Sequence, residues 1–374
     1  MSKDSANSKV KHGIHIILVS SFAGANLATI VLMLGCCLST YLSPELHPRL
    51  SQAGLLFPVF LAIDLMFVIV WLLTSWKWIL LPILGVCCCW GFVWDYFPMN
   101  IRQLTHAQVD SMVSYEGIHL LSYNVAGFAN DSANGMNGSK TAEYIYHSNA
   151  AIICLQECPQ SGTVYKTLSA QLDSMGYETR AHKGLNVFSK YPFIGDAVYK
   201  SPASCSNGSM AWLINIKGDT VLVINNHLQS NCISSEEKMI YGKAIDEYNE
   251  EQIKASGKIL LHRLTQAASG RAAQTDSLCN LIRSNLTKYS IISAGDMNDT
   301  PISYTYQRVS KLLKCAYAES GIGLGISFNR KGFPIRIDHV FVSNDLKTGS
   351  TYIDSNIHSS DHRPLQTHIF KSAK

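Results

Sequence analysis

Three long apolar runs in the first hundred residues restrict the fold more than any other feature of the sequence. They cover about residues 14–38, 53–74 and 78–97. A helix needs about 20 apolar residues to cross the hydrocarbon core of a bilayer, so each run is long enough to span one. A buried helical hairpin in a soluble fold is the alternative, but three such runs in succession are rare in soluble domains. We therefore expect three transmembrane helices within residues 14–98, with the lipid bilayer as their partner.

Basic residues beside these runs predict how they are oriented. Lys3, Lys9 and Lys11 precede the first run, and Lys77 lies in the turn between the second and third runs. Lys and Arg concentrate on the cytoplasmic side of membrane proteins. We therefore expect residues 1–13 and Lys77 in the cytoplasm. Three spans then place the rest of this integral membrane protein on the extracytoplasmic side.

One acidic residue, Asp64, interrupts the second run. An ionisable side chain inside a membrane span often marks a functional site. The alternative is a hydrogen bond that joins two helices, and we favour this interpretation.

The cysteines divide between the two parts of the chain. Five of the eleven fall in the apolar runs, and six follow them, namely Cys154, Cys158, Cys205, Cys232, Cys279 and Cys315. No pair has the spacing of a zinc site. An extracytoplasmic location permits disulfides. Cys205 and Cys232 lie in turn-rich stretches beside two expected strands and are the best candidates for a bridge, with free buried thiols as an equal alternative.

The remainder of the chain reads as a polar connector, residues 99–117, followed by one domain, residues 118–374. Short apolar runs predict strands at residues 119–125, 151–157, 221–226, 290–296, 336–343 and 364–370, and near Tyr177, Asn186, Ile194 and Trp212. Helices are expected at residues 140–149, 164–175 and 235–286, the last with a break near Ser269 and Gly270, and residues 130–139 read as a loop. This order favours an α+β fold in which two sheets pack together with helices outside.

Polar side chains stand where several of these strands end. They are Asn124, Glu157, His227, Asp296, Asn298, Asp338, Asp361 and His362. Taken singly, Asn124 could start a turn and Asp296 could cap a helix. Asp338 differs, because a charge inside an apolar strand requires a partner. Together they supply oxygen ligands and imidazoles, which suit Mg²⁺, Mn²⁺ or Ca²⁺ rather than zinc. Such ions hold phosphate oxygens during phosphoryl transfer.

The motifs SYNV, LQE, NNH, GDMNDTP, RIDHVFVS and SDHRPL occur in this order over about residues 118–370. The series resembles the endonuclease/exonuclease/phosphatase superfamily, which includes deoxyribonuclease I. The resemblance implies a four-layer αββα sandwich with its active site at the edge of the two sheets. The three expected spans lie outside it.

The resemblance also implies which residues hold the metal ion. Glu157 would be the principal ligand, with Asn124 close by and Asp361 able to contribute. Mg²⁺ is the expected ion, with Mn²⁺ and Ca²⁺ as alternatives.

The catalytic roles follow from the same resemblance. Asp296 would orient or deprotonate the attacking water, and Asn298 would fix the phosphate. His362 would contact the scissile phosphate and be held in one tautomer by Asp338. His227 would stabilise the developing charge or assist the leaving oxygen.

The sequence departs from the nuclease members of this family in two places. Cys158 and Pro159 follow Glu157, where some nucleases carry an Arg. The chain also lacks a clear basic stretch interleaved with aromatic residues for gripping a nucleic acid. Arg271 and Gln274 resemble an Arg/Gln pair on a family helix, although a solvated helix face is the interpretation we favour.

These observations predict a metal-dependent hydrolase of a phosphate ester, foremost a phosphodiester, that works by direct attack of water. Its substrate could be a nucleic acid, a lipid headgroup or a sugar phosphate, because the net charge of +4 favours none of them. A non-catalytic receptor or scaffold that keeps the fold is the main alternative. A transporter or channel is disfavoured, because three helices with one buried acidic residue provide little to line a transport pathway. The sequence indicates no protein partner.

Overall fold

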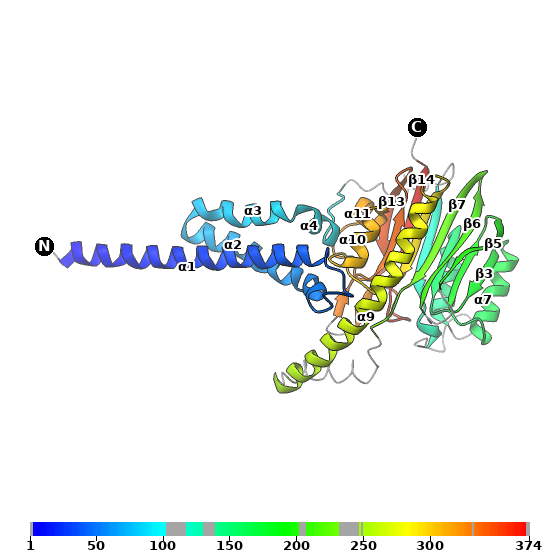
Figure 1. Cartoon of the computed structure of the whole chain (residues 1–374), viewed down its shortest axis with the longest axis horizontal. Coiled ribbons are helices and arrows are strands. Elements are labelled where there is room, and N and C mark those ends of the chain that lie inside the picture. The colour runs from blue at the N-terminus through cyan, green and yellow to red at the C-terminus, as the bar shows by residue number, and fades with distance from the viewer. Residues whose placement is uncertain are drawn as a thin grey trace.

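The structure is a computed structural model, and it describes residues 3–101, 117–129, 139–201, 207–231, 247, 250–330 and 333–371. It consists of N-terminal helices and an α+β domain (Figure 1). Most of the predicted connector, most of the loop at residues 130–139 and both Cys205 and Cys232 lie outside the described residues. The predicted disulfide therefore stays a prediction.

The N-terminal helices follow the apolar runs. They are α1 (Lys3–Ser39), η1 (Leu50–Leu56), α2 (Phe57–Thr74), η2 (Trp76–Ile79), α3 (Leu80–Cys88) and α4 (Trp90–Tyr96). Two helical stretches, His12–Ser39 and Leu50–Thr74, are long and apolar enough to cross a membrane. The third expected span is bent by 69° between Cys88 and Trp90, so it counts as a span only if both pieces cross together. Apolar composition predicts the length of a span, whereas a kink depends on local backbone geometry.

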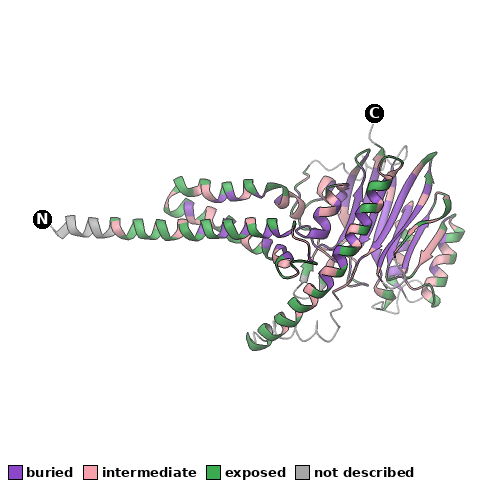
Figure 2. Ribbon diagram, in the orientation of Figure 1, coloured by how far each residue is buried: buried purple, intermediate pink, exposed green. Residues whose placement is uncertain are grey.

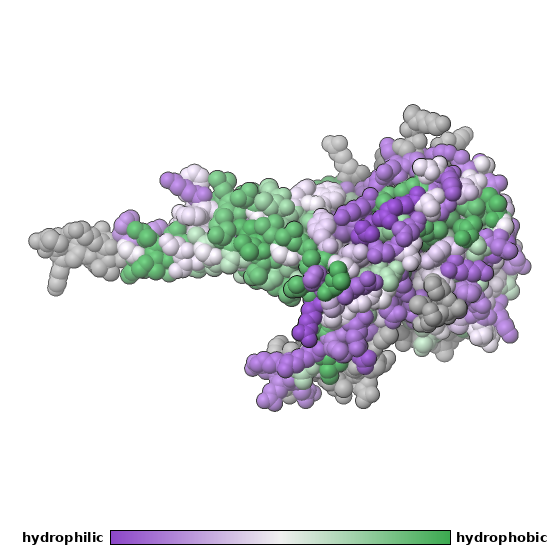
Figure 3. All heavy atoms as spheres, in the orientation of Figure 1, coloured by the Kyte–Doolittle hydropathy of each residue, from purple (hydrophilic) through white to green (hydrophobic). Residues whose placement is uncertain are grey.

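These helices expose apolar residues to the surface (Figures 2 and 3). They also bury two polar side chains, Asn26 and Asp64. Asn26 of α1 donates from Nδ2 to Asp64 Oδ1 of α2 at 2.8 Å. Trp71 donates from Nε1 to Asn26 Oδ1 at 3.0 Å. The favoured interpretation of Asp64, a hydrogen bond between helices, is therefore confirmed.

The α+β domain contains two six-stranded sheets. The first has the order β13-β14-β1-β2-β4-β3, with β1 (Ile118–Asn124), β2 (Ile152–Gln156), β3 (Glu178–His182), β4 (Leu185–Ser189), β13 (Leu346–Ile353) and β14 (Leu365–Lys371). The second has the order β5-β6-β7-β8-β12-β9, with β5 (Phe193–Lys200), β6 (Gly208–Ile216), β7 (Asp219–His227), β8 (Ser290–Asp296), β9 (Lys314–Cys315) and β12 (Asp338–Val342). Both sheets are mixed, because β1 pairs parallel with β2 and β7 parallel with β8 while their other pairs are antiparallel. A hairpin of β10 (Phe328–Arg330) and β11 (Phe333–Ile335) stands apart.

Side chains alternate between the two faces of each strand, so each sheet has an inner and an outer face. Leu120, Ile152 and Val223 belong to a buried cluster between the sheets. The outer face of the first sheet packs against α6 (Lys140–Ser148) and α7 (Thr163–Ser174). The outer face of the second packs against α9 (Glu250–Asn285) and α10 (Tyr304–Ser310), with α11 (Ala316–Ser320) beside them (Figure 1). The predicted α+β class with two packed sheets is confirmed.

One sequence-based expectation about elements is wrong, and several elements were not expected, among them β13. The break expected near Ser269 and Gly270 does not occur, because α9 runs through both residues. Glycine lowers helix propensity by only about 1 kcal/mol, which tertiary packing overrides. The strand β13 was not expected, since its sequence LKTGSTYI is mostly polar and contains a glycine. It forms because it pairs with β14 along one edge of the first sheet.

Candidate functional site

The two parallel strand pairs bring four polar residues to one edge of the domain. Asn124 is the last residue of β1, and Glu157 directly follows β2. His227 and Asp296 are the last residues of β7 and β8, where they are paired in register. Because parallel neighbours end on the same side of a sheet, these side chains converge.

Asn124 links the carboxylates of Glu157 and Asp296. Its Nδ2 donates to Glu157 Oε1 and to Asp296 Oδ2, each at 3.0 Å. His227 Nε2 lies 3.4 Å from Glu157 Oε1 and 3.8 Å from Asp296 Oδ2. One ligand atom from each of Glu157, His227 and Asp296 lies within 4.8 Å of the others. We call these three residues the first ligand group.

Local backbone geometry sets the direction of two of these side chains, Asn124 at the end of β1 and Glu157 just after β2. Asn124 Oδ1 accepts a hydrogen bond from Ala126 N at 3.0 Å, so the amide turns its nitrogen toward the carboxylates. Glu157 has φ of 49°, in the left-handed region. A residue with a β-carbon adopts that region at a cost, which often occurs at functional sites. The Glu157 carboxylate is half-exposed and can be approached from solvent.

The second ligand group consists of Asp296, Asp338 and His362, whose ligand atoms also lie within 4.8 Å of one another. Asp338 opens β12 and pairs with Asp296 across the antiparallel ladder. His362 Nδ1 lies 2.8 Å from Asp338 Oδ2, and its Nε2 lies 3.6 Å from Asp296 Oδ2. Asp338 therefore has the partner that a charge in an apolar strand requires. Asp296 belongs to both groups.

Burial and charge shift the pKa values of this second group. Burial alone would lower the pKa of His362, but Asp338 and Asp296 outweigh it and raise that pKa to about 10. Burial would raise the pKa of Asp338, but His362 holds it below its ordinary value. The pKa of Asp296 is raised, chiefly by burial. At neutral pH His362 is therefore a cation held by a carboxylate.

Asn298 and Asp361, the other two predicted site residues, belong to neither ligand group. Asn298 has φ of 51° and donates from Nδ2 to Leu228 O at 3.0 Å, so its amide is tied to the segment after β7. Its backbone N donates to Asp296 Oδ1 at 2.8 Å. Asp361 precedes His362 and is half-buried, but it belongs to neither ligand group.

Sequence reasoning missed Asn207, which contacts His227. Asn207 Nδ2 lies 3.2 Å from both ring nitrogens of His227 and donates to Leu228 O at 3.2 Å. Asn207 lies in a turn-rich stretch far from His227 along the chain. Its sequence context carried no signal for this contact, which forms because β6 and β7 pair.

Arg271 corrects another prediction, because it does not lie on a solvated helix face. Its side chain is 1% exposed. Arg271 Nη1 donates to Gln229 O at 3.1 Å and to Asn231 Oδ1 at 2.6 Å, and its Nε lies 3.5 Å from Asp299 Oδ2. Gln274, half-buried, accepts from Gln229 N at 2.7 Å through Oε1. Both residues of this pair hold the segment that follows His227.

Buried amides join the two sheets beneath the site. Gln156 Nε2 donates to Asn225 Oδ1 at 2.7 Å. Asn225 Nδ2 in turn donates to Leu155 O and Asn186 O at 2.9 and 3.0 Å. Buried polar groups that satisfy one another in this way fix the register of the sheets.

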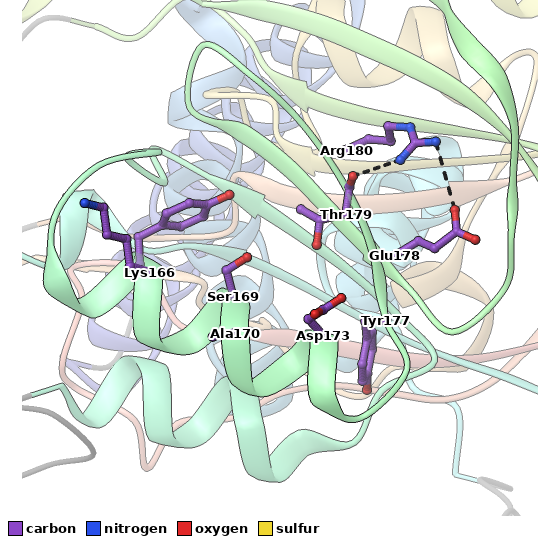
Figure 4. Close-up of a pocket in the computed structure, with 9 residues that line it drawn as sticks. Lys166, Ser169, Ala170, Asp173, Tyr177, Glu178, Thr179 and Arg180 are labelled. Atoms are coloured by element: carbon purple, nitrogen blue, oxygen red, sulfur yellow. Dashed lines mark hydrogen bonds and ion pairs between the residues drawn. The ribbon is translucent and has the colours of Figure 1, made fainter.

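The cysteines described in the domain do not belong to the site. Cys154, Cys158, Cys279 and Cys315 are free and buried. A surface hollow of about 650 Å³ between α7 and β3 also lies apart from it (Figure 4). Lys166, Asp173, Glu178 and Arg180 are among its lining residues, and none of the predicted site residues lines it.

The first ligand group has the donor chemistry of a divalent-cation site. Two carboxylates lie within hydrogen-bond distance of one amide nitrogen, and an imidazole faces both. Like charges brought this close favour a cation between them. Oxygen donors with one imidazole suit Mg²⁺ or Mn²⁺. The residues therefore fit a divalent metal ion.

Comparison with known proteins agrees with this geometry. The Endonuclease/Exonuclease/phosphatase family profile matches residues 121–362, and a domain of unknown function matches residues 18–96. No curated protein sequence matches the chain.

Solved structures give weaker likenesses. Truncated Caenorhabditis elegans TDP2 is 15% identical with a TM-score of 0.47, over 68% of this chain and 98% of that one. The human Nocturnin catalytic domain is 16% identical with a TM-score of 0.48, over 69% and 94%. An endonuclease/exonuclease/phosphatase from Bacteroides vulgatus is 14% identical with a TM-score of 0.47, over 68% and 99%.

Members of the matched family are hydrolases that typically cleave phosphodiester bonds. The profile spans well over half of the chain, and its span contains all eight polar residues that the sequence singled out. The protein therefore belongs to the Endonuclease/Exonuclease/phosphatase family.

Proposed function

We propose that this chain hydrolyses a phosphodiester with the help of a divalent metal ion, using a catalytic domain at residues 118–374. The observation that carries the proposal is that Asp296 is shared by two ligand groups at one sheet edge. One group opens to solvent through Glu157, while the other is buried and holds a charged His362. An exposed cation site next to a fixed positive charge suits the binding of an anionic ester.

Glu157 would hold the metal ion, with His227 and Asp296 beside it. We propose Mg²⁺, with Mn²⁺ or Ca²⁺ as alternatives. When bound, such an ion neutralises charge on the phosphate oxygens. Asn124 keeps the carboxylates of Glu157 and Asp296 together through its Nδ2. Asp361 could add a ligand from the segment that carries His362.

Asp296 would accept the proton of the attacking water at Oδ2. Its Oδ1 accepts a hydrogen bond from Asn298 N. Its Oδ2 accepts one from Asn124 Nδ2 and is the oxygen that faces both imidazoles. Burial favours the protonated form of this carboxyl and raises its pKa, which makes it a stronger base than an exposed aspartate. Asn298 would orient the phosphate from the same segment.

His362 would contact the scissile phosphate through Nε2–H, because its Nδ1–H donates to Asp338. Asp338 thereby fixes the ring orientation and keeps the charge on it. His227, whose Nε2 lies 3.8 Å from Asp296 Oδ2, would stabilise the charge that develops on the leaving oxygen.

We further propose that residues 14–98 cross a bilayer three times, with residues 1–13 in the cytoplasm, a connector at residues 99–117 and the catalytic domain outside. The N-terminus and the α2–α3 turn that contains Lys77 lie at the end of the helices away from the domain (Figure 1). Protease treatment of intact cells tests this topology. Digestion of the domain is expected, and full protection would contradict it.

The catalytic proposal is tested with the full chain purified in mild detergent and a soluble bis-aryl phosphodiester. Wild type is expected to hydrolyse it with Mg²⁺ and to lose activity with a chelator. The His362→Ala variant should lose activity, on the order of 10²–10⁴-fold, because it removes a positioned charge. His262→Ala, an exposed histidine on α9, is the matched control and should retain the wild-type rate. Equal rates for wild type and His362→Ala would favour the non-catalytic scaffold instead.

A further inference from the structure

The N-terminal helices are packed against the segment that follows β8. Ile302 is buried in one cluster with Met33, Phe57 and Cys89 of the helices. The Gly54 backbone lies so close that an added β-carbon would stand 1.9 Å from Ile302 O. Ile302 follows Asn298 by four residues. The helices therefore support one of the two segments that build the site.

The other supported segment is the one that leads into β12. Arg336, two residues before Asp338, is buried and donates from Nη2 to Asp95 O of α4. The Asp95 carboxylate accepts hydrogen bonds from Tyr306 OH at 3.2 Å and from Gln307 Nε2 at 3.0 Å. Asp95, near the end of α4, is thus bound to the domain through both its backbone and its side chain.

More contacts fix the same junction. Trp94 Nε1 donates to Ala318 O at 3.0 Å, and Asn100 Nδ2 donates to Gly321 O at 2.8 Å. Ser269 of α9 donates to Pro44 O at 3.1 Å. The ends of the helices therefore hold the domain in one orientation, with α4 lying beside α10 and α11 (Figure 1).

Exposed apolar side chains surround this junction. Phe97, Met99, Ile101, Ile322 and Leu324 are each at least 40% exposed, and we call them the apolar collar. The two segments that carry them lie side by side, because Met99 and Ile322 pair in an isolated β-bridge and Gly323 N donates to Pro98 O at 2.9 Å.

The apolar collar leads directly to the catalytic edge. Leu324 O accepts a hydrogen bond from Arg336 Nη1 at 2.9 Å. Three residues after Leu324, Ser327 Oγ accepts from Asp338 N at 3.1 Å. The segment that bears the exposed Ile322 and Leu324 thus ends against the backbone of Asp338, the residue whose carboxylate holds His362.

Exposed apolar side chains in a contiguous patch mark an interaction surface. Here the patch adjoins helices whose apolar surface continues up to the domain (Figure 3). A side chain at the end of a membrane span lies at the level of the headgroups. The occupant that fits both the apolar collar and the helices is therefore the outer layer of the bilayer itself.

We propose, on the basis of the proposed function, that the apolar collar lies in the bilayer surface and that the substrate is the phosphodiester headgroup of a phospholipid in the same membrane. Water oxygen bonds to phosphorus, one ester P–O bond breaks, and the leaving oxygen takes up the proton. The apolar collar sets the height of the catalytic edge above the lipid, so a lipid phosphodiester reaches Glu157 and His362 without leaving the membrane.

Position in the bilayer is tested without any measurement of activity. A photoreactive benzoylphenylalanine replaces Ile322 in the full chain, reconstituted in vesicles of phosphatidylcholine and phosphatidylglycerol. Irradiation is expected to give a lipid adduct, detected by mass. The same replacement at Val198, an exposed residue of β5 far from the helices in Figure 1, should give none. Absence of an adduct at position 322, or equal adducts at both, overturns the inference.

Substrate class is tested in the same vesicles by mass spectrometry of the lipid products. Wild type is expected to cleave phospholipid, and Ile322→Ser with Leu324→Ser should slow this about tenfold, because less apolar surface enters the bilayer. Cleavage of a soluble bis-aryl phosphodiester should be unchanged in that variant, and Val198→Ser should match wild type on both. An equal fall on both substrates, or no fall on lipid, overturns the inference.

Two further outcomes separate the proposals. Cleavage of the soluble diester or of an oligonucleotide with no cleavage of phospholipid overturns the lipid assignment and leaves the proposed function standing. If wild type cleaves none of the three, the proposed function itself is wrong and the assignment of a lipid substrate fails with it.

Discussion

The N-terminal helices and the α+β domain bury aspartates in different surroundings. Asp64 lies among apolar helices, where Asn26 donates to one of its oxygens at 2.8 Å. Asp338 lies at the start of a strand and holds a charged histidine at 2.8 Å. The first contact joins two helices through a single hydrogen bond, which involves one of the two Asp64 oxygens. The second sets the charge and direction of an imidazole whose Nε2 lies 3.6 Å from Asp296 Oδ2.

The contrast shows which polar neighbours a buried carboxyl group needs before it can take part in a reaction. Asp296 has two imidazoles within 4 Å, an amide donor and a half-exposed carboxylate neighbour. The polar contacts described for Asp64 are confined to the helices. Removing a polar partner should therefore reduce activity or the free energy of unfolding more in the domain than in the helices. Four experiments test this expectation.

The largest effect is expected at Glu157, the carboxylate of the first ligand group that is open to solvent. Glu157→Gln keeps the shape but removes the charge that would hold the metal ion. Hydrolysis should fall on the order of 10³-fold, or about 4 kcal/mol of transition-state stabilisation. The melting temperature should change little, because the side chain is half-exposed. Glu251→Gln, exposed on α9, is the control. A rate within threefold of wild type would remove Glu157 from the metal site.

The next effect concerns Arg271, whose buried guanidinium faces Asp299 and the segment after β7. Arg271→Met leaves the half-buried Asp299 carboxylate without its cation. Removal of one partner of a buried ion pair costs about 3–5 kcal/mol, so a loss of about 3 kcal/mol in the free energy of unfolding is expected. Denaturant titration measures it.

Arg283→Met, at an exposed position of the same helix, is the matched control and should change that free energy by less than about 0.5 kcal/mol. Equal losses in the two variants would show that the Arg271 contacts contribute nothing specific.

Glu157 and Arg271 also show what the sequence could and could not predict. Glu157 was predictable, because a carboxylate directly after an apolar strand has few structural uses. Five further residues were predictable only as a set, because polar side chains recur where several expected strands begin or end, namely Asn124, His227, Asp296, Asp338 and His362. Strand pairing and the contact between His362 and Asp338 bring them together. Arg271 was not, because its helix is amphipathic and a sequence does not say how deeply one arginine is buried. The role of Asn207 depends on a contact between distant segments, and the bend near Cys89 depends on local backbone geometry.

A third experiment follows the pH dependence of stability in the absence of metal. The pKa of His362 in the folded protein, about 10, lies above its unfolded value of about 6.5. Its contribution to stability is therefore complete below about pH 6.5 and is lost as the pH rises through about 10. The difference in unfolding free energy between wild type and His362→Gln should shrink by on the order of 3 kcal/mol from about pH 7 to about pH 10. A constant difference would mean that His362 is not held as a cation.

The smallest effect is expected for Asp64 in the N-terminal helices. Asp64→Leu removes a hydrogen bond to Asn26 but leaves the bond from Trp71 to Asn26 in place. Such bonds between membrane helices contribute about 0.6 kcal/mol on average, because the separated helices also find polar partners. A detergent-unfolding titration of the full chain should show a loss of about that size, with hydrolysis of a soluble diester unchanged. Leu65→Ala, at an exposed neighbouring position, is the control. A loss as large as that of Arg271→Met would mean that buried polar groups in the helices and in the domain are equally costly to disturb, and the contrast between the two regions would not hold.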